Sequence, residues 1–295
     1  MREMSERLID RLRGARRGPL VLAVTLAGSL ATVAGAAPAL ATSALRAEFA
    51  PFVHCPVTEA TQCVDSHVTG GEFKIDLKTV PIEKVNIELQ GGLESETWKP
   101  IPLIAAVGAP TLSNTPLTVP GGLAGIGGIG GEVTATAELA EPVSSIIIAK
   151  GHLLNKEGTA VVLPIKVKLS NETLGKECYI GSDAEPIVLN LTTGTTAPPL
   201  PGTPITGGHD SPEGGAKGKI VKLSEVTLVD NTFAVPGATG CGESLSPVVD
   251  LAVDADIGLP APAGYNTAIM KGYFEETTSE YEIKYKPKEK KAKKK

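Results

Sequence analysis

The four cysteines are the residues whose type and number indicate a chemistry most directly, namely disulfide bonding. They are Cys55, Cys63, Cys178 and Cys241. An even number of cysteines in a chain that carries an export signal, described below, is typical of disulfide bonds. Four cysteines allow three connectivities, and the sequence alone leaves the choice open. Proximity favours a bond from Cys55 to Cys63, which leaves the other two to close a long loop.

Other residues that could bind a metal or catalyse hydrolysis do not follow a known spacing. None of the four histidines stands in HExxH, and no CxxC pair occurs; the histidines are His54, His67, His152 and His209. The serine-hydrolase motif GxSxG is absent, and residues 240–244 (GCGES) have a different spacing. We therefore predict no catalytic residue and no metal ligand, and we expect that the protein is not an enzyme.

Residues 125–130 (GIGGIG) match the dinucleotide-binding motif GxGxxG. That motif has to leave a strand and open a helix within a βαβ unit. Here the motif is followed by GEVTATAEL, whose alternation predicts another strand. The context argues against a nucleotide, and we predict no cofactor.

Asp250, Asp254 and Asp256 lie at even offsets in VVDLAVDADI. On a strand, all three carboxylates would point to one face. We interpret them as a solvent-facing polar stripe opposite the apolar residues of the same segment. A calcium site or a glycosidase carboxylate pair are the alternatives. The spacing of an EF-hand loop is missing, and a single tryptophan, Trp98, gives little aromatic surface for sugars.

The elements that must position these residues are predicted to be strands. Polar and apolar residues alternate with period two between Gly and Pro residues, and no segment after the leader sustains a helical period. The predicted fold is an all-β antiparallel β-sandwich, as one domain or as two tandem sandwiches. The predicted strands lie in GEFKIDLKTVPI, KVNIELQ, GEVTATAEL, TAVVLPIKVKLS, PIVLNLTT, KIVKLSEVTLVD, VVDLAVDADI and NTAIMKGYFEETTSEYEIKY.

Residues 192–218 divide the strand-rich chain because they are rich in Pro, Gly and Thr. They form either a linker between a first part, residues 42–191, and a second part, residues 219–283, or a long surface loop. A bond between Cys178 and Cys241 would span this segment and favours the loop.

Residues 101–131 carry no charge. Their four prolines exclude a membrane-spanning helix. The simplest interpretation is a buried hairpin with a Gly-rich connection. The functional alternative is an apolar mouth that receives a hydrophobic ligand or contacts lipid.

Residues 1–41 have the parts of a signal peptide: a basic start, an uncharged apolar run and small residues at its end. We predict cleavage between Ala41 and Thr42. A retained membrane anchor is the alternative, because the run is long enough to cross a bilayer. The rest of the chain, by prediction, has no membrane-spanning segment.

Charge is distributed unevenly beyond the leader. Residues 42–283 hold 14 basic and 29 acidic side chains, a net charge of −15, which argues against nucleic acid as a partner. Residues 284–295 hold eight lysines and one glutamate, and we predict a disordered tail. The stretch from Lys286 to Lys295 is either a solvated end or an electrostatic contact to an anionic cell envelope.

Five stretches of the chain after the leader have a distinctive sequence. They are FAPFVHCP (49–56), PTLSNTPLTVPGGL (110–123), CYIGS (178–182), PIVLNLTTGTTAPPLPGTPITG (186–207) and LVDNTFAVPGATGCG (228–242). Together they resemble a group of secreted actinobacterial proteins of unknown function. The resemblance covers most of the chain after the leader and implies an actinobacterial source and an extracytoplasmic location, with no activity or site residue to carry over.

Three functional hypotheses follow. The first is an exported, non-enzymatic β-sandwich protein of the cell surface or medium that acts through binding or structure. The second is a carrier or sensor of an apolar ligand that uses residues 101–131. The third is a secreted hydrolase whose site has no recognised motif.

Overall fold

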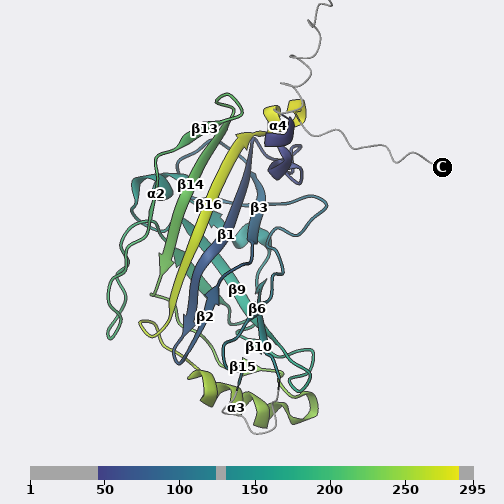
Figure 1. The fold of residues 1–295 in the computed structure, drawn as a ribbon, viewed down its shortest axis with the longest axis vertical. Helices are drawn as coiled ribbons and strands as arrows, with labels where there is room; N and C mark the ends of the chain where they lie inside the picture. Colours follow the sequence, from purple (N-terminus) through teal and green to yellow (C-terminus); the bar gives the residue numbers. More distant parts are fainter. Residues whose placement is uncertain (1–45, 124–130, 286–295) are drawn as a thin grey trace, which may run out of the picture. The chain divides into compact units, whose positions relative to one another are not determined.

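The computed structural model describes residues 46–123 and 131–285 (Figure 1). The predicted cleavage between Ala41 and Thr42, the GxGxxG match at residues 125–130 and the stretch from Lys286 to Lys295 lie outside these ranges. The described residues belong to one compact unit, Ala41–Lys295. No helix in the described part of the chain is both long and apolar enough to span a membrane.

The prediction of an all-β antiparallel sandwich is confirmed. The strands form two antiparallel sheets, and strand residues outnumber helical ones. Sheet A has the strand order β12-β14-β16-β1-β3-β5, with β13 on β14 and β2 on β1. Figure 1 shows its long central strands β14, β16 and β1 side by side. The strands of sheet A are β1 (Gln62–Ile75), β2 (Lys78–Ile82), β3 (Ile87–Leu93), β5 (Ile104–Ala105), β12 (Gly208–His209), β13 (Glu213–Gly215), β14 (Ile220–Asp230) and β16 (Thr267–Thr278).

Sheet B has the order β15-β10-β9-β7-β6, with β11 and β8 also paired to β9, and β4 paired to β8. Its strands are β4 (Ile101–Pro102), β6 (Leu117–Thr118), β7 (Thr134–Leu139), β8 (Ile147–Ile148), β9 (Val161–Ser170), β10 (Tyr179–Ile180), β11 (Ile187–Leu191) and β15 (Ala238–Thr239). In β11 the apolar residues Ile187, Leu189 and Leu191 are buried while the residues between them are exposed. That alternation places one face of the strand on the core, as its period-two sequence predicts.

The main core lies between the two sheets and draws buried residues from both, such as Val64 and Leu223 from sheet A and Ile165 and Leu189 from sheet B. A β-bulge between Val68 and Gly70 shifts the register of β1 on β16. Because the bulge adds one residue, even-numbered side chains face the core before it and odd-numbered ones after it. Gly71 follows at φ +114°, where a Cβ atom would come within 1.9 Å of a backbone oxygen of β16. Only glycine fits there.

Helix α3 (Ser246–Ile257) corrects the prediction of a strand. The segment VVDLAVDADI forms no strand and belongs to this helix. The helix has a proline in its first turn and ends at Ile257, and Gly258 follows it with a φ of +88°, which suits the residue after a helix C-terminus. Val249, Val253 and Ile257 follow a spacing of four and pack on the core, whereas Leu251, counted as part of an alternating apolar face, is exposed. The buried residues of this segment therefore follow the spacing of a helix and not the alternation of a strand.

The other helices are short. They are α2 (Lys150–Asn155) and α4 (Ser279–Tyr285), together with 3-10 turns at Ala50–Phe52, Val143–Ser145 and Glu243–Leu245. The last predicted strand is thus too long, because β16 ends at Thr278 and α4 follows it. α4 packs on the segment that precedes β1, and the Phe49 and Tyr285 rings stack with centroids 5.2 Å apart.

Both disulfides join the pairs that proximity favours, Cys55 with Cys63 and Cys178 with Cys241. The first lies in a small second core beside α4, and the second joins the ends of β10 and β15 in the main core. Residues 192–218, which the second bond spans, contribute β12 and β13 to sheet A and an isolated bridge between Thr192 and Val229.

Candidate functional site

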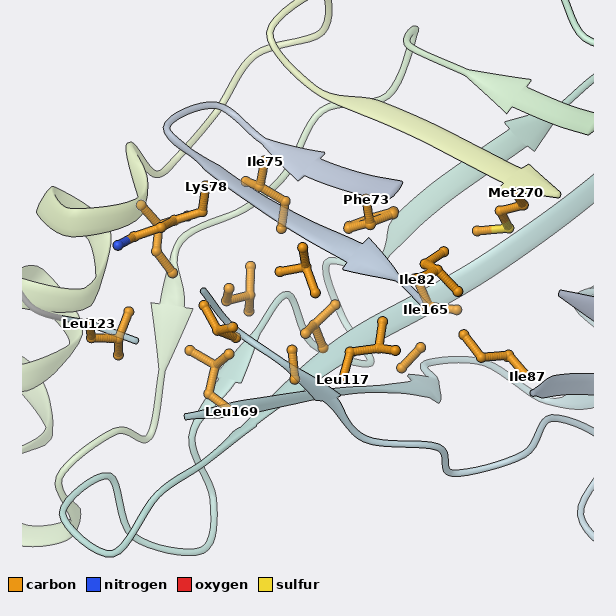
Figure 2. Close-up of a pocket in the computed structure, with 17 residues that line it drawn as sticks. Phe73, Ile75, Lys78, Ile82, Ile87, Leu117, Leu123, Ile165, Leu169 and Met270 are labelled. Carbon is orange, nitrogen blue, oxygen red and sulfur yellow. The ribbon is translucent and has the colours of Figure 1, made fainter. Parts of the chain in front are cut away.

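Two cavities lie between the sheets, and their linings are almost entirely apolar. Cavity 1 has a volume of about 90 Å³ and is drawn in Figure 2. Phe73 and Ile75 of β1 face Leu117 of β6 and Leu169 of β9 across it. Figure 2 shows Phe73 and Ile75 of sheet A above Leu117 and Leu169 of sheet B. The arrangement suits a hydrocarbon group, since aliphatic and aromatic side chains supply nearly all of the contact surface.

Cavity 2 has a volume of about 100 Å³ and is lined by Val64, Ser66 and Val68 of β1, among other residues. It adjoins cavity 1, because four residues line both: Ile87, Ala137, Ile165 and Met270. The bulge in β1 makes this possible. Even-numbered residues before the bulge line cavity 2, and odd-numbered residues after it line cavity 1.

The uncharged residues 101–131 contribute to both cavities. Leu103 and Leu112 line cavity 2, and Leu117, Val119 and Leu123 line cavity 1. Four of these five side chains are buried. Part of the described segment is thus buried in the core, and the same side chains line an apolar space. Its short strands β4, β5 and β6 pair with β8, β3 and β7 rather than with one another.

A single charged residue, Lys78, stands in the described lining of the two cavities. Its Nζ atom lies 2.8 Å from Oδ2 of Asp256 on α3 and donates to the carbonyl oxygen of Gly122 at 3.1 Å. In Figure 2 the nitrogen points away from the apolar side chains. The stem of Lys78 therefore covers apolar surface while its ammonium group marks the α3 end of cavity 1.

A different kind of site lies on the other face of sheet A. Asp65 and His67 of β1 and Glu88 of β3 each offer a ligand atom, and these atoms lie within 4.8 Å of one another. It is the one such group of possible metal ligands within residues 46–123 and 131–285. Nε2 of His67 is 2.8 Å from Oδ2 of Asp65, and Nδ1 of His67 is 2.7 Å from Oδ1 of Asn86. Both ring nitrogens thus face oxygen acceptors.

The electrostatics of this group follow from burial and from the buried Asp65 carboxylate. Burial opposes the charged form of His67, but the hydrogen bond and the charge of Asp65 outweigh it and raise the pKa of His67. Burial, and then the charge of Asp65, raise the pKa of Glu88. Burial, followed by the charges of Asp65 and Glu275, raises the pKa of Tyr273, whose ring stacks on His67 at 4.6 Å between centroids.

The group opens into a cleft of about 550 Å³ on the outer face of sheet A. His67, Glu88 and Tyr273 form part of its lining, and residues 109–114 and the 3-10 turn at Ala50–Phe52 contribute to its walls. The bond between Cys55 and Cys63 attaches this turn to the start of β1. A solvent molecule or a small polar ligand could therefore reach His67 and Glu88 from the cleft.

The structure separates most of the residues that the sequence singles out. Asp250 accepts from the backbone nitrogen of Cys241, Asp254 accepts from that of Ala238, and Asp256 pairs with Lys78, so these three form no common site. His54, His152 and His209 each contact a backbone oxygen and stand outside the polar group. His54 lines the same cleft as His67, whereas His152 lies on α2 and His209 contacts the α2 residue Leu154. In the sequence, only the spacing of Asp65 and His67 could have predicted the polar group, because an acid and a histidine two residues apart on a strand point to the same face.

Comparison of the chain with family models, with curated proteins and with solved structures finds no match.

Proposed function

We propose that the protein binds an apolar ligand between its two sheets, outside the cytoplasm. The observation that carries the proposal is the pair of adjoining apolar cavities, which share four lining residues. This is the carrier or sensor function that the uncharged residues 101–131 suggest. Binding needs no catalytic group, so the proposal agrees with the expectation of a protein that is not an enzyme.

The energetic cost of the cavities supports the proposal. Protein interiors are packed as densely as organic crystals. A cavity costs roughly 24 cal/mol per Å³ in core truncation series. At that rate, cavity 1, with a volume of about 90 Å³, lowers the stability of the fold by about 2 kcal/mol. A ligand that fills the space would restore those contacts.

The shape and chemistry of the space indicate the ligand class. Each cavity is smaller than the apolar cavity of about 150 Å³ that binds benzene in a well-studied case. The two are adjacent, so a single hydrocarbon chain that spans both would bury more surface than two separate small molecules. Lys78 at the edge of cavity 1 could attract an anionic head group if its pair with Asp256 rearranges.

The proposed location rests on two observations. Two disulfides fit an extracytoplasmic protein, because reducing compartments do not sustain them. The sequence of residues 1–41 has the composition of a signal peptide. We propose a secreted or surface-attached protein, with the lysines from Lys286 to Lys295 as an electrostatic contact to an anionic envelope.

The test is binding of cis-parinaric acid, a fluorescent fatty acid, to delipidated protein. Ala137 lines both cavities, so Ala137→Leu should occupy the space and weaken binding at least tenfold while the fold remains. Ala105→Leu is the matched control, because Ala105 lies on β5 at the surface, away from both linings. Native mass spectrometry of the undelipidated protein should also show a retained apolar molecule.

The proposal fails if the wild-type protein neither binds the probe nor retains any apolar molecule. It also fails if Ala137→Leu and Ala105→Leu bind the probe equally well. Near-ultraviolet circular dichroism shows whether each variant keeps its native packing, and Ala135→Leu, which affects cavity 1 alone, replaces Ala137→Leu if the latter does not fold.

A further inference from the structure

We propose that Asp65, His67 and Glu88 form a binding site for one divalent transition-metal ion, with zinc as the probe ion. The site is independent of the cavities, since it lies on the opposite face of sheet A. It would hold the ion by one imidazole nitrogen and two carboxylate oxygens and leave a position open to the cleft.

The backbone brings the three residues together in a fixed arrangement. Asp65 and His67 are two residues apart on β1, so their side chains leave the same face of the strand. Glu88 is the cross-strand partner of His67 on β3. Two paired strands at the centre of a sheet hold such ligands more rigidly than loops do. The ligand atoms, all within 4.8 Å of one another, could surround an ion after small side-chain rotations.

An unsatisfied buried oxygen points to the ion independently. Asp65 is completely buried, and its Oδ1 atom has no hydrogen-bond partner, while its Oδ2 atom contacts His67. A buried carboxylate oxygen without a partner is costly. Glu88 lies beside it, and a second carboxylate cannot donate a hydrogen bond unless it is protonated. A metal ion between the two carboxylates would satisfy Oδ1 and remove their repulsion.

Asn86 completes the arrangement as a positioning residue. Histidine ligands usually donate their second ring N–H to an oxygen acceptor, which fixes the tautomer and the ring. Here Nδ1 of His67 faces Oδ1 of Asn86 at 2.7 Å, so Nε2, the nitrogen beside Asp65, is the one that would bind the ion. Tyr273 stacks on the same ring and holds its plane.

The donor set selects the class of ion. Imidazole suits zinc, copper, iron and nickel, whereas calcium and magnesium prefer oxygen ligands alone and usually more of them. One nitrogen and two oxygens from the protein leave a fourth, open position, as in catalytic zinc sites. The alternative occupant is a proton shared by Asp65 and Glu88, and the experiment distinguishes it from a metal.

The experiment is calorimetric titration of zinc chloride into the chelator-treated, disulfide-bonded full chain at pH 7.5. We expect one ion per chain, and we expect His67→Gln and Glu88→Gln each to weaken binding at least tenfold. His54→Gln is the control, because His54 lines the same cleft but stands outside the group. Asn86→Ala should weaken binding, while Asn86→Asp, which keeps an acceptor oxygen, should restore it.

A second measurement needs no variant. Nitrogen NMR of His67 should show zinc on Nε2 with the proton retained on Nδ1. The proposal is overturned if the wild-type protein binds no zinc, if His54→Gln weakens binding as much as His67→Gln does, or if the His67 resonances do not respond to the ion. In those cases a shared proton accounts for the group.

Discussion

Nε2 of His67 lies 2.8 Å from Oδ2 of Asp65, two residues back on the same strand. The residues next to this pair, Val64, Ser66 and Val68, point to the opposite side of β1 and line cavity 2. One strand thus separates a polar group on the outer face of sheet A from an apolar space inside the sandwich. Because the two sites share a strand but no side chain, substitutions can test them separately.

The first prediction concerns pH. Folding raises the pKa of His67 above its ordinary value of 6.5, so its stabilising contribution is complete below that pH and is lost as pH rises through the folded-state pKa. Folding also raises the pKa of Glu88 above its ordinary value of 4.5, so the stabilising contribution of Glu88 is likewise lost as pH rises, but at a lower pH. In the presence of a chelator, the wild-type protein should therefore lose stability relative to His67→Gln between pH 5.5 and pH 8.

Urea unfolding of both proteins across this range measures the difference in the free energy of unfolding. His54→Gln serves as the comparison, because Nδ1 of His54 contacts the backbone oxygen of Val107. A difference between wild type and His67→Gln that stays constant with pH would show that His67 does not gain its proton on folding.

The second prediction concerns Met270, which lines both cavities. Met270→Ala should enlarge and join the two spaces. Truncation of a buried methionine to alanine typically costs 2 to 5 kcal/mol, and the partial exposure of Met270 places the cost near 2 kcal/mol. If a hydrocarbon chain spans the cavities, this variant should bind longer fatty acids better than the wild-type protein does. A chain-length series measured by fluorescence displacement checks this, and an unchanged preference would argue against a ligand in this space.

The third prediction concerns the ion pair of Lys78 and Asp256, whose side chains are both largely buried. Lys78→Met keeps the apolar stem but removes the charge that faces Asp256. We expect a loss of stability of about 3 kcal/mol, at the low end of the range for breaking a buried ion pair, because the Asp256 carboxylate loses its counter-ion while both side chains keep some exposure to solvent. Adding Asp256→Asn should recover much of the loss, and thermal unfolding of the single and double variants measures the coupling. Additive effects would mean that the pair is not coupled.

The sequence predicts the sheets well because their signal is local. Alternation in segments such as Ile187–Leu191 identifies both the strand and its buried face. α3 is different, since Val249, Leu251 and Val253 fit a two-residue period while Val249, Val253 and Ile257 fit a helix. The choice depends on which of these side chains the rest of the fold covers, and that is a tertiary property.

The polar group could be predicted only in part. The spacing of Asp65 and His67 places both on one face of a strand, and that much is present in the sequence. Glu88 joins them through the register of β3 on β1, which depends on the loop between the strands and on core packing. The cavities are still less accessible to sequence analysis, because a gap between side chains is a property of the packed fold.

The fourth prediction concerns the lysine-rich end. Deleting Lys286 to Lys295 removes seven lysines and one glutamate. Retention of the protein on anionic vesicles at low salt should then fall, while the melting temperature should not change. Salt should release the full chain, because surface charge interactions are screened within about 10 Å at 0.1 M ionic strength. Equal retention of both forms at every salt concentration would assign the stretch no role in attachment.

The last prediction compares the two disulfides. The bond from Cys178 to Cys241 closes a separation of 63 residues, and the bond from Cys55 to Cys63 closes one of 8. The chain-entropy model assigns about 4 kcal/mol to the longer loop and about 2.5 kcal/mol to the shorter one. Replacing the pair at Cys178 and Cys241 by serine should therefore lower the melting temperature more than replacing the other pair.

Each bond also has a local consequence that distinguishes it. Cys55 and Cys63 attach the turn at Ala50–Phe52 beside the cleft, so their loss should weaken zinc binding more than it weakens fatty-acid binding. Cys178 and Cys241 belong to the main core near the α3 end of sheet B, so their loss should weaken fatty-acid binding instead. Melting curves and both titrations on the two double-serine variants measure these effects. An identical pattern in the two variants would show that neither disulfide supports one site in particular.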